Sequence, residues 1–156
     1  GVILIMFQPI TEDSLDTVLE IINSNSQYNI LVNGNPSRSI KEARSEFLNQ
    51  TTESYLIMLD NKYVGVIDFL KSNPNDNCSW IGLLIIHGNY HSMGYGKKAY
   101  LSFEEKLKQR HLANVRIGIL KENIDAKRYW KSLGFIFYEN AQWEEKQVEC
   151  FEKQLI

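Results

Sequence analysis

The sequence has little of what marks a secreted or metal-binding protein. It contains only two cysteines, Cys78 and Cys150, which lie far apart and form no C-x-x-C pair. A disulfide framework or zinc site is therefore not indicated, and a reduced intracellular setting is the simpler interpretation, with a single disulfide left open. The three histidines, His87, His91 and His111, lack acidic or thiol companions at metal-ligand spacing, so no metal site is predicted.

An excess of one charge and a long hydrophobic run are also missing. There are 17 basic and 19 acidic side chains, a net charge of −2, whereas a nucleic-acid binder needs a basic excess or stripe. The apolar start, residues 2–7, is far shorter than a membrane span or a signal-peptide core. We therefore expect a cytoplasmic protein that binds neither nucleic acid nor membranes.

What is present is typical of one globular domain. The 156 residues are 44% hydrophobic and 23% charged, which predicts a single domain over residues 1–156 with a core of its own. Hydrophobic periodicity predicts seven strands and four helices, and hence a mixed sheet with helices on its faces. The strands are expected near residues 3–8, 55–59, 63–70, 79–86, 115–119, 135–138 and 147–155. The helices are expected near residues 15–22, 40–47, 97–110 and 126–133, and residues 27–38 are expected to form a loop.

A glycine-punctuated segment follows the most apolar strand. Residues 91–97, which we call the glycine loop, read His-Ser-Met-Gly-Tyr-Gly-Lys and precede a predicted helix. Glycines there let backbone N–H groups converge without Cβ clashes, and the first N–H groups of a helix lack internal partners. Such a loop can hold a phosphate group, although a simple tight turn accounts equally well for two glycines alone. The spacing matches neither a Walker loop nor a dinucleotide fingerprint.

Two motifs together resemble the GNAT acetyltransferase superfamily. His91-x-x-Gly94-x-Gly96 is similar to its Q/R-x-x-G-x-G/A signature. The second family segment, N-x-x-A-x-x-hydrophobic-Y-x-x-x-G-F, is matched by Asn123, Ala126, Tyr129, Trp130, Gly134 and Phe135. The resemblance extends over nearly the whole chain. It implies a mixed, mostly antiparallel seven-stranded sheet flanked by about four helices, and transfer of an acetyl group from acetyl-coenzyme A to an amine.

The resemblance also assigns a cofactor site. The pantetheine arm would lie along the fourth strand, where a bulge commonly separates it from the fifth strand, and the pyrophosphate would lie on the glycine loop. The cofactor-binding residues that it implies are Leu84, Ile86, His91, Ser92, Met93, Gly94, Tyr95, Gly96, Lys97, Asn123 and Trp130.

The sequence departs from the family pattern at two positions. His91 replaces Gln or Arg, and Trp130 occupies the position of a tyrosine that is proposed to reprotonate the departing thiolate. Indole N–H is a donor only, so Trp130 cannot supply that proton. Tyr129 lies about 100° around the helix and is expected to face the core. The usual acid is therefore expected to be missing, which favours as an alternative a protein that binds or senses acyl-coenzyme A with weak or no catalysis.

The acceptor side carries fewer signals. Asp68 is the first candidate for the general base and Glu53 the second, although a solvated polar strand position accounts equally well for Asp68. Trp80, Tyr28 and Asn33 are candidates to line the acceptor pocket. The acceptor is expected to be an amine of a small molecule or a peptide. A homodimer is a common family outcome, and the last strand is a candidate edge for it; a module that only borrows the fold is the remaining alternative.

Overall fold

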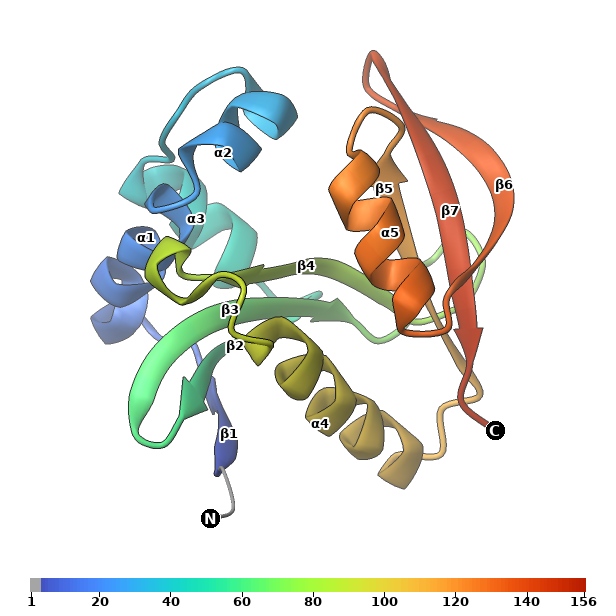
Figure 1. Cartoon of the computed structure of the whole chain (residues 1–156), viewed down its shortest axis with the longest axis horizontal. Helices are drawn as coiled ribbons and strands as arrows, with labels where there is room; N and C mark the ends of the chain where they lie inside the picture. The colour runs from blue at the N-terminus through green and yellow to red at the C-terminus, as the bar shows by residue number, and fades with distance from the viewer. Residues whose placement is uncertain (1–3) are drawn as a thin grey trace.

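The computed structural model describes residues 4–156 and shows one seven-stranded sheet in the order β1-β2-β3-β4-β5-β7-β6 (Figure 1). Neighbouring strands pair antiparallel except β4 and β5, which are parallel. The strands are β1 (Ile5–Pro9), β2 (Glu53–Leu59), β3 (Lys62–Leu70), β4 (Trp80–Ile86), β5 (Asn114–Leu120), β6 (Ile136–Trp143) and β7 (Lys146–Gln154). The expected mixed, mostly antiparallel sheet is confirmed. The part of the first predicted strand at Ile3 lies outside the described residues.

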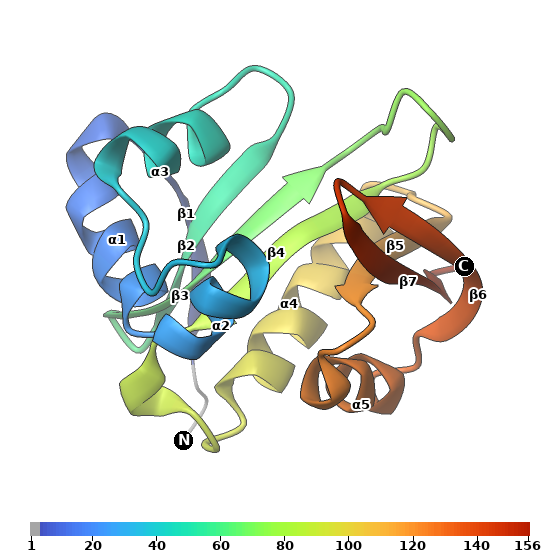
Figure 2. The same ribbon diagram turned by 90° about the horizontal axis from the view of Figure 1, so that it is seen from above.

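Within residues 4–156, five α-helices flank this sheet, one more than the sequence predicted. They are α1 (Leu15–Asn23), α2 (Ser26–Asn33), α3 (Ile40–Phe47), α4 (Tyr95–Gln109) and α5 (Ile124–Ser132), with short 3-10 turns at Glu12–Ser14 and Gly88–Tyr90. Figure 2 shows α1 and α3 on one side of β1–β4 and α4 on the other. Within the described residues, no helix combines the length and apolarity that crossing a membrane requires.

The interior strand β3 explains why the core has two layers. Val66 packs into a cluster with Leu15 and Val18 of α1, whereas its neighbours Ile67 and Phe69 pack into a cluster with α4 and α5. Successive side chains of a strand point to opposite faces, so a strand covered on both sides must be apolar throughout. All of these side chains are buried. Asp68 is the polar exception among them.

Strands β4 and β5 share the fewest paired residues of any two neighbouring strands in the sheet. Only Trp80 with Arg116 and Ile81 with Ile117 are paired, at the beginning of both strands. On its other side β4 skips one residue against β3: Asp68 pairs with Leu83 and Phe69 with Ile81, which leaves Gly82 as the extra residue of a bulge. The expected bulge and separation of the two strands are thus confirmed. We call this region the β4–β5 seam.

Local turn chemistry fixes several element ends. Asp60 and Asn61 have φ values of 48° and 67°, the left-handed pair that a tight β2–β3 hairpin requires. Ser39 caps α3, with its side chain accepting from the Glu42 N–H at 3.2 Å. Gly134, with φ of 97°, ends α5 in the left-handed conformation.

Three sequence predictions were wrong. Residues 27–38 are not all loop, because Ser26–Asn33 forms α2 and the Asn-Gly turn only ends it, with Gly34 left-handed at φ 79°. The sixth strand runs from Ile136 to Trp143 rather than ending near residue 138, because β7 offers pairing partners along that length. The last strand is not an edge, because β7 lies between β5 and β6. Cys78 and Cys150 are free thiols, half-buried and buried respectively.

One core tyrosine gives a stability prediction. Tyr100 of α4 is fully buried, and its hydroxyl finds no hydrogen-bond partner among residues 4–156. A buried polar group without a partner costs about 1–3 kcal/mol. We expect Tyr100→Phe to raise the free energy of unfolding by about 1 kcal/mol in urea denaturation. A clear loss of stability would contradict this and show that the hydroxyl is hydrogen-bonded in solution.

Candidate active site

The glycine loop leads into the start of α4. Gly94 precedes the helix with φ of 77° and ψ of 10°, and nothing lies within 4 Å of where its Cβ would be. In the first backbone hydrogen bond of α4, the Lys98 N–H donates to the Gly94 carbonyl at 3.2 Å. The N–H groups of residues 95–97 therefore precede the first hydrogen bond of the helix. These N–H groups and the positive end of the helix dipole favour an anion at this place.

A cavity of about 480 Å³ lies between this loop, β4 and α5. We call it the loop pocket. It brings together eight of the residues that the family resemblance implied for the cofactor. They are Leu84, Ile86, His91, Ser92, Gly94, Tyr95, Gly96 and Lys97. Met93 is 54% exposed and does not line this pocket.

The His91 side chain anchors the glycine loop through a hydrogen bond to β4. Its Nε2 lies 2.8 Å from the Ile86 carbonyl, which also accepts a hydrogen bond from Asn25 Nδ2 at 3.0 Å. The side chain therefore ties the glycine loop to the end of β4. A histidine can do this because either ring nitrogen can carry the proton, so the departure from Gln or Arg keeps a hydrogen-bond donor at this position.

The orientation of α5 reverses the expected roles of Tyr129 and Trp130. Tyr129 lines the loop pocket, and its hydroxyl lies 3.1 Å from where a Cβ on Gly96 would be. Trp130 is only 8% exposed and packs its ring against Tyr100 and Phe135, at centroid distances of 5.4 and 5.1 Å. Tyr129 packs partly against the core cluster, as predicted, but it also lines the pocket, because the larger apolar indole takes the more buried side of the helix.

The Tyr129 hydroxyl is well suited to meet a ligand. It is buried, and within the described part of the chain it has no hydrogen-bond partner. Burial raises the pKa of Tyr129 above its usual range, so the hydroxyl stays protonated at neutral pH. A protonated donor without a partner at the wall of a pocket is an unusual and costly arrangement unless a ligand completes it.

A second cavity, of about 340 Å³, occupies the β4–β5 seam. We call it the seam pocket. Its walls come from β4, β5, α2 and α5, so it connects the side of the sheet that carries α5 with the side that carries α2. Tyr129 lines this pocket as well as the loop pocket, whereas Asn123 and Trp130 line the seam pocket alone. Asn123 also caps α5, with its Oδ1 accepting from the Ala126 N–H at 3.1 Å.

Only one of the three aromatic and polar candidates for the acceptor side lines the seam pocket. Tyr28 of α2 does, together with Val32. Asn33 ends α2 and does not line it. Trp80 is held at the first β4–β5 pair, where its Nε1 donates to Asp76 Oδ2 at 2.9 Å. Trp80 therefore supports the closed end of the seam.

The two carboxylate candidates lie in different settings. Asp68 is 8% exposed, its Oδ1 accepts from Ser54 Oγ at 2.5 Å, and burial raises its pKa. Glu53 instead accepts both ends of the Arg110 guanidinium, at 2.9 and 3.0 Å, and this pairing lowers its pKa. A carboxylate held by arginine is a poor base. Neither Glu53 nor Asp68 lines the loop pocket or the seam pocket.

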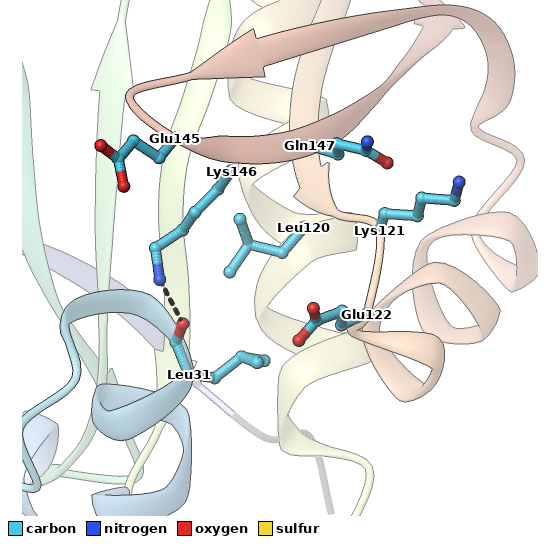
Figure 3. Close-up of a pocket in the computed structure, with 7 residues that line it drawn as sticks. All are labelled: Leu31, Leu120, Lys121, Glu122, Glu145, Lys146 and Gln147. Carbon is cyan, nitrogen blue, oxygen red and sulfur yellow. Dashed lines mark hydrogen bonds between the residues drawn. The ribbon is translucent and has the colours of Figure 1, made fainter.

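A third cavity, of about 400 Å³, lies where the β6–β7 turn approaches α2. We call it the hairpin pocket. Figure 3 shows Lys146 reaching from β7 to the Leu31 carbonyl near the end of α2, a hydrogen bond of 2.9 Å. Glu122 and Glu145 also face this cavity, and Leu120 lines both it and the seam pocket. The hairpin pocket thus adjoins the seam on the side of the sheet that carries α2.

Sequence reasoning missed Tyr129, Gly82 and Lys146. An isolated glycine within an apolar strand is a signal for a bulge, and Gly82 could have been found in this way. Tyr129 and Trp130 are adjacent in α5, and the sequence pattern alone does not decide which of the two lies on the more buried side of the helix. The position of Lys146 depends on α2, which was predicted to be loop.

Solved structures share this fold at low sequence identity. An acetyltransferase from Thermus thermophilus is 16% identical with a TM-score of 0.83, and the match covers 96% of each chain. A ribosomal L7/L12 alpha-N-protein acetyltransferase in complex with coenzyme A is 14% identical with a TM-score of 0.77, covering 96% of this chain and 93% of that one. A spermidine N-acetyltransferase chimera from Vibrio cholerae is 10% identical with a TM-score of 0.72, covering 97% and 95%.

No curated protein matches the chain in sequence. A family model does match, and its description is the acetyltransferase (GNAT) family. The match spans residues 18–135 and thus includes the glycine loop, both strands of the seam and α5. Since it covers most of the chain, the protein belongs to the GNAT acetyltransferase family and is an acyltransferase.

Proposed function

We propose that this protein transfers an acetyl group from acetyl-coenzyme A directly to an amine. The observation that carries this proposal is Tyr129, a residue that lines both the loop pocket and the seam pocket and whose buried hydroxyl has no hydrogen-bond partner within residues 4–156. One ligand could therefore reach it from the glycine loop, and another from the side of α2.

The residues present fit the cofactor. The N–H groups at the start of α4 would hold its phosphates, with Ser92 and Lys97 beside them, and the absence of a Cβ at Gly96 leaves room next to Tyr129. Leu84 and Ile86 would offer their backbone to the pantetheine arm. Asn123 and Trp130 line the seam pocket and would approach the same arm from α5. Exposed Met93 would contribute only its backbone.

When bound, acetyl-coenzyme A supplies a thioester that is activated toward attack by an amine. Tyr129 holds a proton at Oη that it can release toward the loop pocket and the seam pocket. Asp68 is the candidate base, because burial raises its pKa toward that of an amine. The seam pocket fixes where the reacting groups can meet, and such positioning alone can contribute roughly 7–11 kcal/mol.

We further propose that residues 1–156 act as a single cytoplasmic domain, and that the acceptor is a small-molecule or peptide amine. Neighbours with this fold include a spermidine acetyltransferase and a ribosomal-protein acetyltransferase, which supports both acceptor classes. A homodimer would form through β6 rather than the last strand, because β6 is the edge on that side of the sheet.

Calorimetric titration with acetyl-coenzyme A tests the cofactor site, and thiol release in the presence of amines tests the transfer. Binding together with amine-dependent thiol release is expected. Binding without thiol release for any amine would favour the sensing alternative, and absence of binding would overturn the proposal.

The role of Tyr129 gives a separate prediction. We expect Tyr129→Phe to lower kcat by roughly 10²-fold and to leave the Kd for coenzyme A nearly unchanged, because only the proton donor is removed. Tyr138→Phe is the matched control: its hydroxyl is also buried and unpartnered within residues 4–156, and it lines none of the three pockets described above. Equal kcat values for the two variants would remove Tyr129 from the chemistry.

A further inference from the structure

Within residues 4–156, no group that lines the seam pocket is well placed to take a proton from a cationic amine. Of the residues in its walls, only Tyr28, Asp125 and Tyr129 can titrate. Burial raises the pKa of both tyrosines, so they stay protonated at neutral pH, and the side chain of Asp125 is 97% exposed to water. Asp68, the candidate base, lines neither this pocket nor the loop pocket. An acceptor that is already partly neutral therefore suits the seam pocket best.

Amines differ greatly in the fraction that is neutral at about pH 7.5. The α-amino group of a peptide has a pKa of about 7.7–8.0, so roughly a quarter to two-fifths of it is neutral at that pH. A lysine-like alkyl amine has a pKa of about 10.4, which leaves about 0.1% neutral. The more basic amine is the better nucleophile once it is neutral, and this offsets part of the difference. Where no base lies at the pocket wall, the α-amine is the favoured acceptor.

The two strands of the seam present bare main chain to the same pocket. Ile81 and Ile117 form the last pair between β4 and β5, and the residues that follow them, Gly82 and Gly118, are both exposed and both line the seam pocket. Glycine within a strand often marks a place where another backbone approaches closely. A peptide brings a main chain to lie across these two glycines, and a polyamine has none.

The hairpin pocket continues the seam pocket on the side of α2, and Leu120 lines both. Its charged residues balance, because Glu122 and Glu145 are matched by Lys121 and Lys146 (Figure 3). Such a lining offers hydrogen-bond donors and acceptors to a peptide chain. It provides no net negative potential to attract a polycation. The cavity next to the seam therefore fits the continuation of a peptide better than the second cation of a polyamine.

We propose that the acceptor is the α-amino group of a peptide, with its first residue in the seam pocket beside Tyr28 and Val32 and its next residues in the hairpin pocket. In the transfer, the neutral nitrogen forms a C–N bond to the thioester carbon while the C–S bond breaks. The nitrogen gives one proton to water, and the sulfur takes one proton from Tyr129, which solvent replaces. This inference rests on the proposed function and names its acceptor class.

Thiol release by the wild-type protein tests the acceptor class with three probes. They are an alanine-initiated hexapeptide, an N-acetylated hexapeptide with one lysine, and spermidine. The free peptide should react with a kcat/KM at least roughly 10-fold above the other two at about pH 7.5. Its kcat/KM should level off above about pH 8, where its α-amine is neutral, whereas that of a lysine-like amine should rise towards about pH 10. A preference for spermidine or for the lysine peptide would overturn the proposal.

The variant Leu31→Trp tests the path through the hairpin pocket. Leu31 lines this pocket, and its bond to Lys146 uses the backbone carbonyl, which the substitution keeps. The indole should raise KM for the free hexapeptide at least roughly 10-fold. It should leave KM for alanine amide and the Kd for acetyl-coenzyme A unchanged, because only the longer chain reaches the pocket. Ile30→Trp is the matched control and should change none of these values, since Ile30 is 50% exposed and lines none of the three pockets.

A wild-type KM for the hexapeptide in Leu31→Trp would overturn the path. If this variant does not fold, the wild-type protein still decides, because KM should fall from alanine amide to the hexapeptide as further residues enter the hairpin pocket. Equal KM values for the two would overturn the proposal. Binding of acetyl-coenzyme A with thiol release for spermidine alone contradicts this inference and leaves the proposed function in place. Absence of acetyl-coenzyme A binding refutes the proposed function instead.

Discussion

Replacing Gly94 by aspartate should weaken the binding of coenzyme A at least 100-fold, a loss of about 2.7 kcal/mol. Gly94 precedes the first turn of α4 with a left-handed φ of 77°. No atom lies within 4 Å of a Cβ there, so the new side chain fits the fold and enters the space in front of the helix. A carboxylate at that point takes the place of a phosphate and repels others. Calorimetric titration with coenzyme A measures the change.

Gly34→Asp is the control for this variant. Gly34 ends α2 with a φ of 79°, and its Cβ position is equally open. Both substitutions therefore carry the same small conformational cost, which aspartate tolerates better than most residues. Because Gly34 does not line the loop pocket, the control should bind coenzyme A like the wild type. Similar Kd values for the two variants would exclude the glycine loop as the phosphate site.

Replacing Phe69 by alanine should lower the free energy of unfolding by about 3–5 kcal/mol. Phe69 of β3 is fully buried, with its ring edge-on to Phe103 of α4 at a centroid distance of 5.5 Å. The guanidinium of Arg110 lies over the same ring at 5.6 Å. Since whole domains have about 5–15 kcal/mol of stability, this one truncation removes a large share. Urea denaturation of wild type and variant gives the difference.

Phe137→Ala provides the comparison on the sheet edge. Phe137 of β6 is 43% exposed and touches the buried Phe151 ring only at a centroid distance of 5.9 Å. Its loss should cost about 1 kcal/mol, in line with the smaller area removed from water. If the two variants were equally destabilised, the core would not be centred between β3 and α4.

Elements with a local signal were predictable from the sequence. The Asp60-Asn61 turn, the Ser39 cap and the Gly134 helix end each depend on one or two residues whose chemistry fixes the backbone. The strands around them followed from alternating or continuous apolar residues, depending on whether one or both of their faces are buried. The two motif segments then placed the glycine loop and α5 beside the β4–β5 seam, before any contact was known.

The features that were missed depend on neighbours distant in sequence. Helix α2 is short and weakly patterned, and Lys146 from the far end of the chain donates to one of its last carbonyls. Whether Tyr129 or Trp130 enters the core was decided by the rings of Tyr100 and Phe135. The close approach of Gly82 to Asp68 depends on the register between β3 and β4. None of these relations is visible in a window of the sequence.

Because so few residues of β4 and β5 are paired, the sheet consists of two groups of strands, and most backbone hydrogen bonds between strands lie within one group or the other. Strands β1–β4 pair among themselves, and so do β5–β7, with only two residue pairs joining the groups. The backbone therefore contributes little to holding the two groups together. Side-chain packing supplies that cohesion, since α4 and α5 share one apolar cluster with strands of both groups. The shape of the seam pocket, whose walls come from both groups, therefore depends on how these side chains pack and not on a continuous backbone ladder.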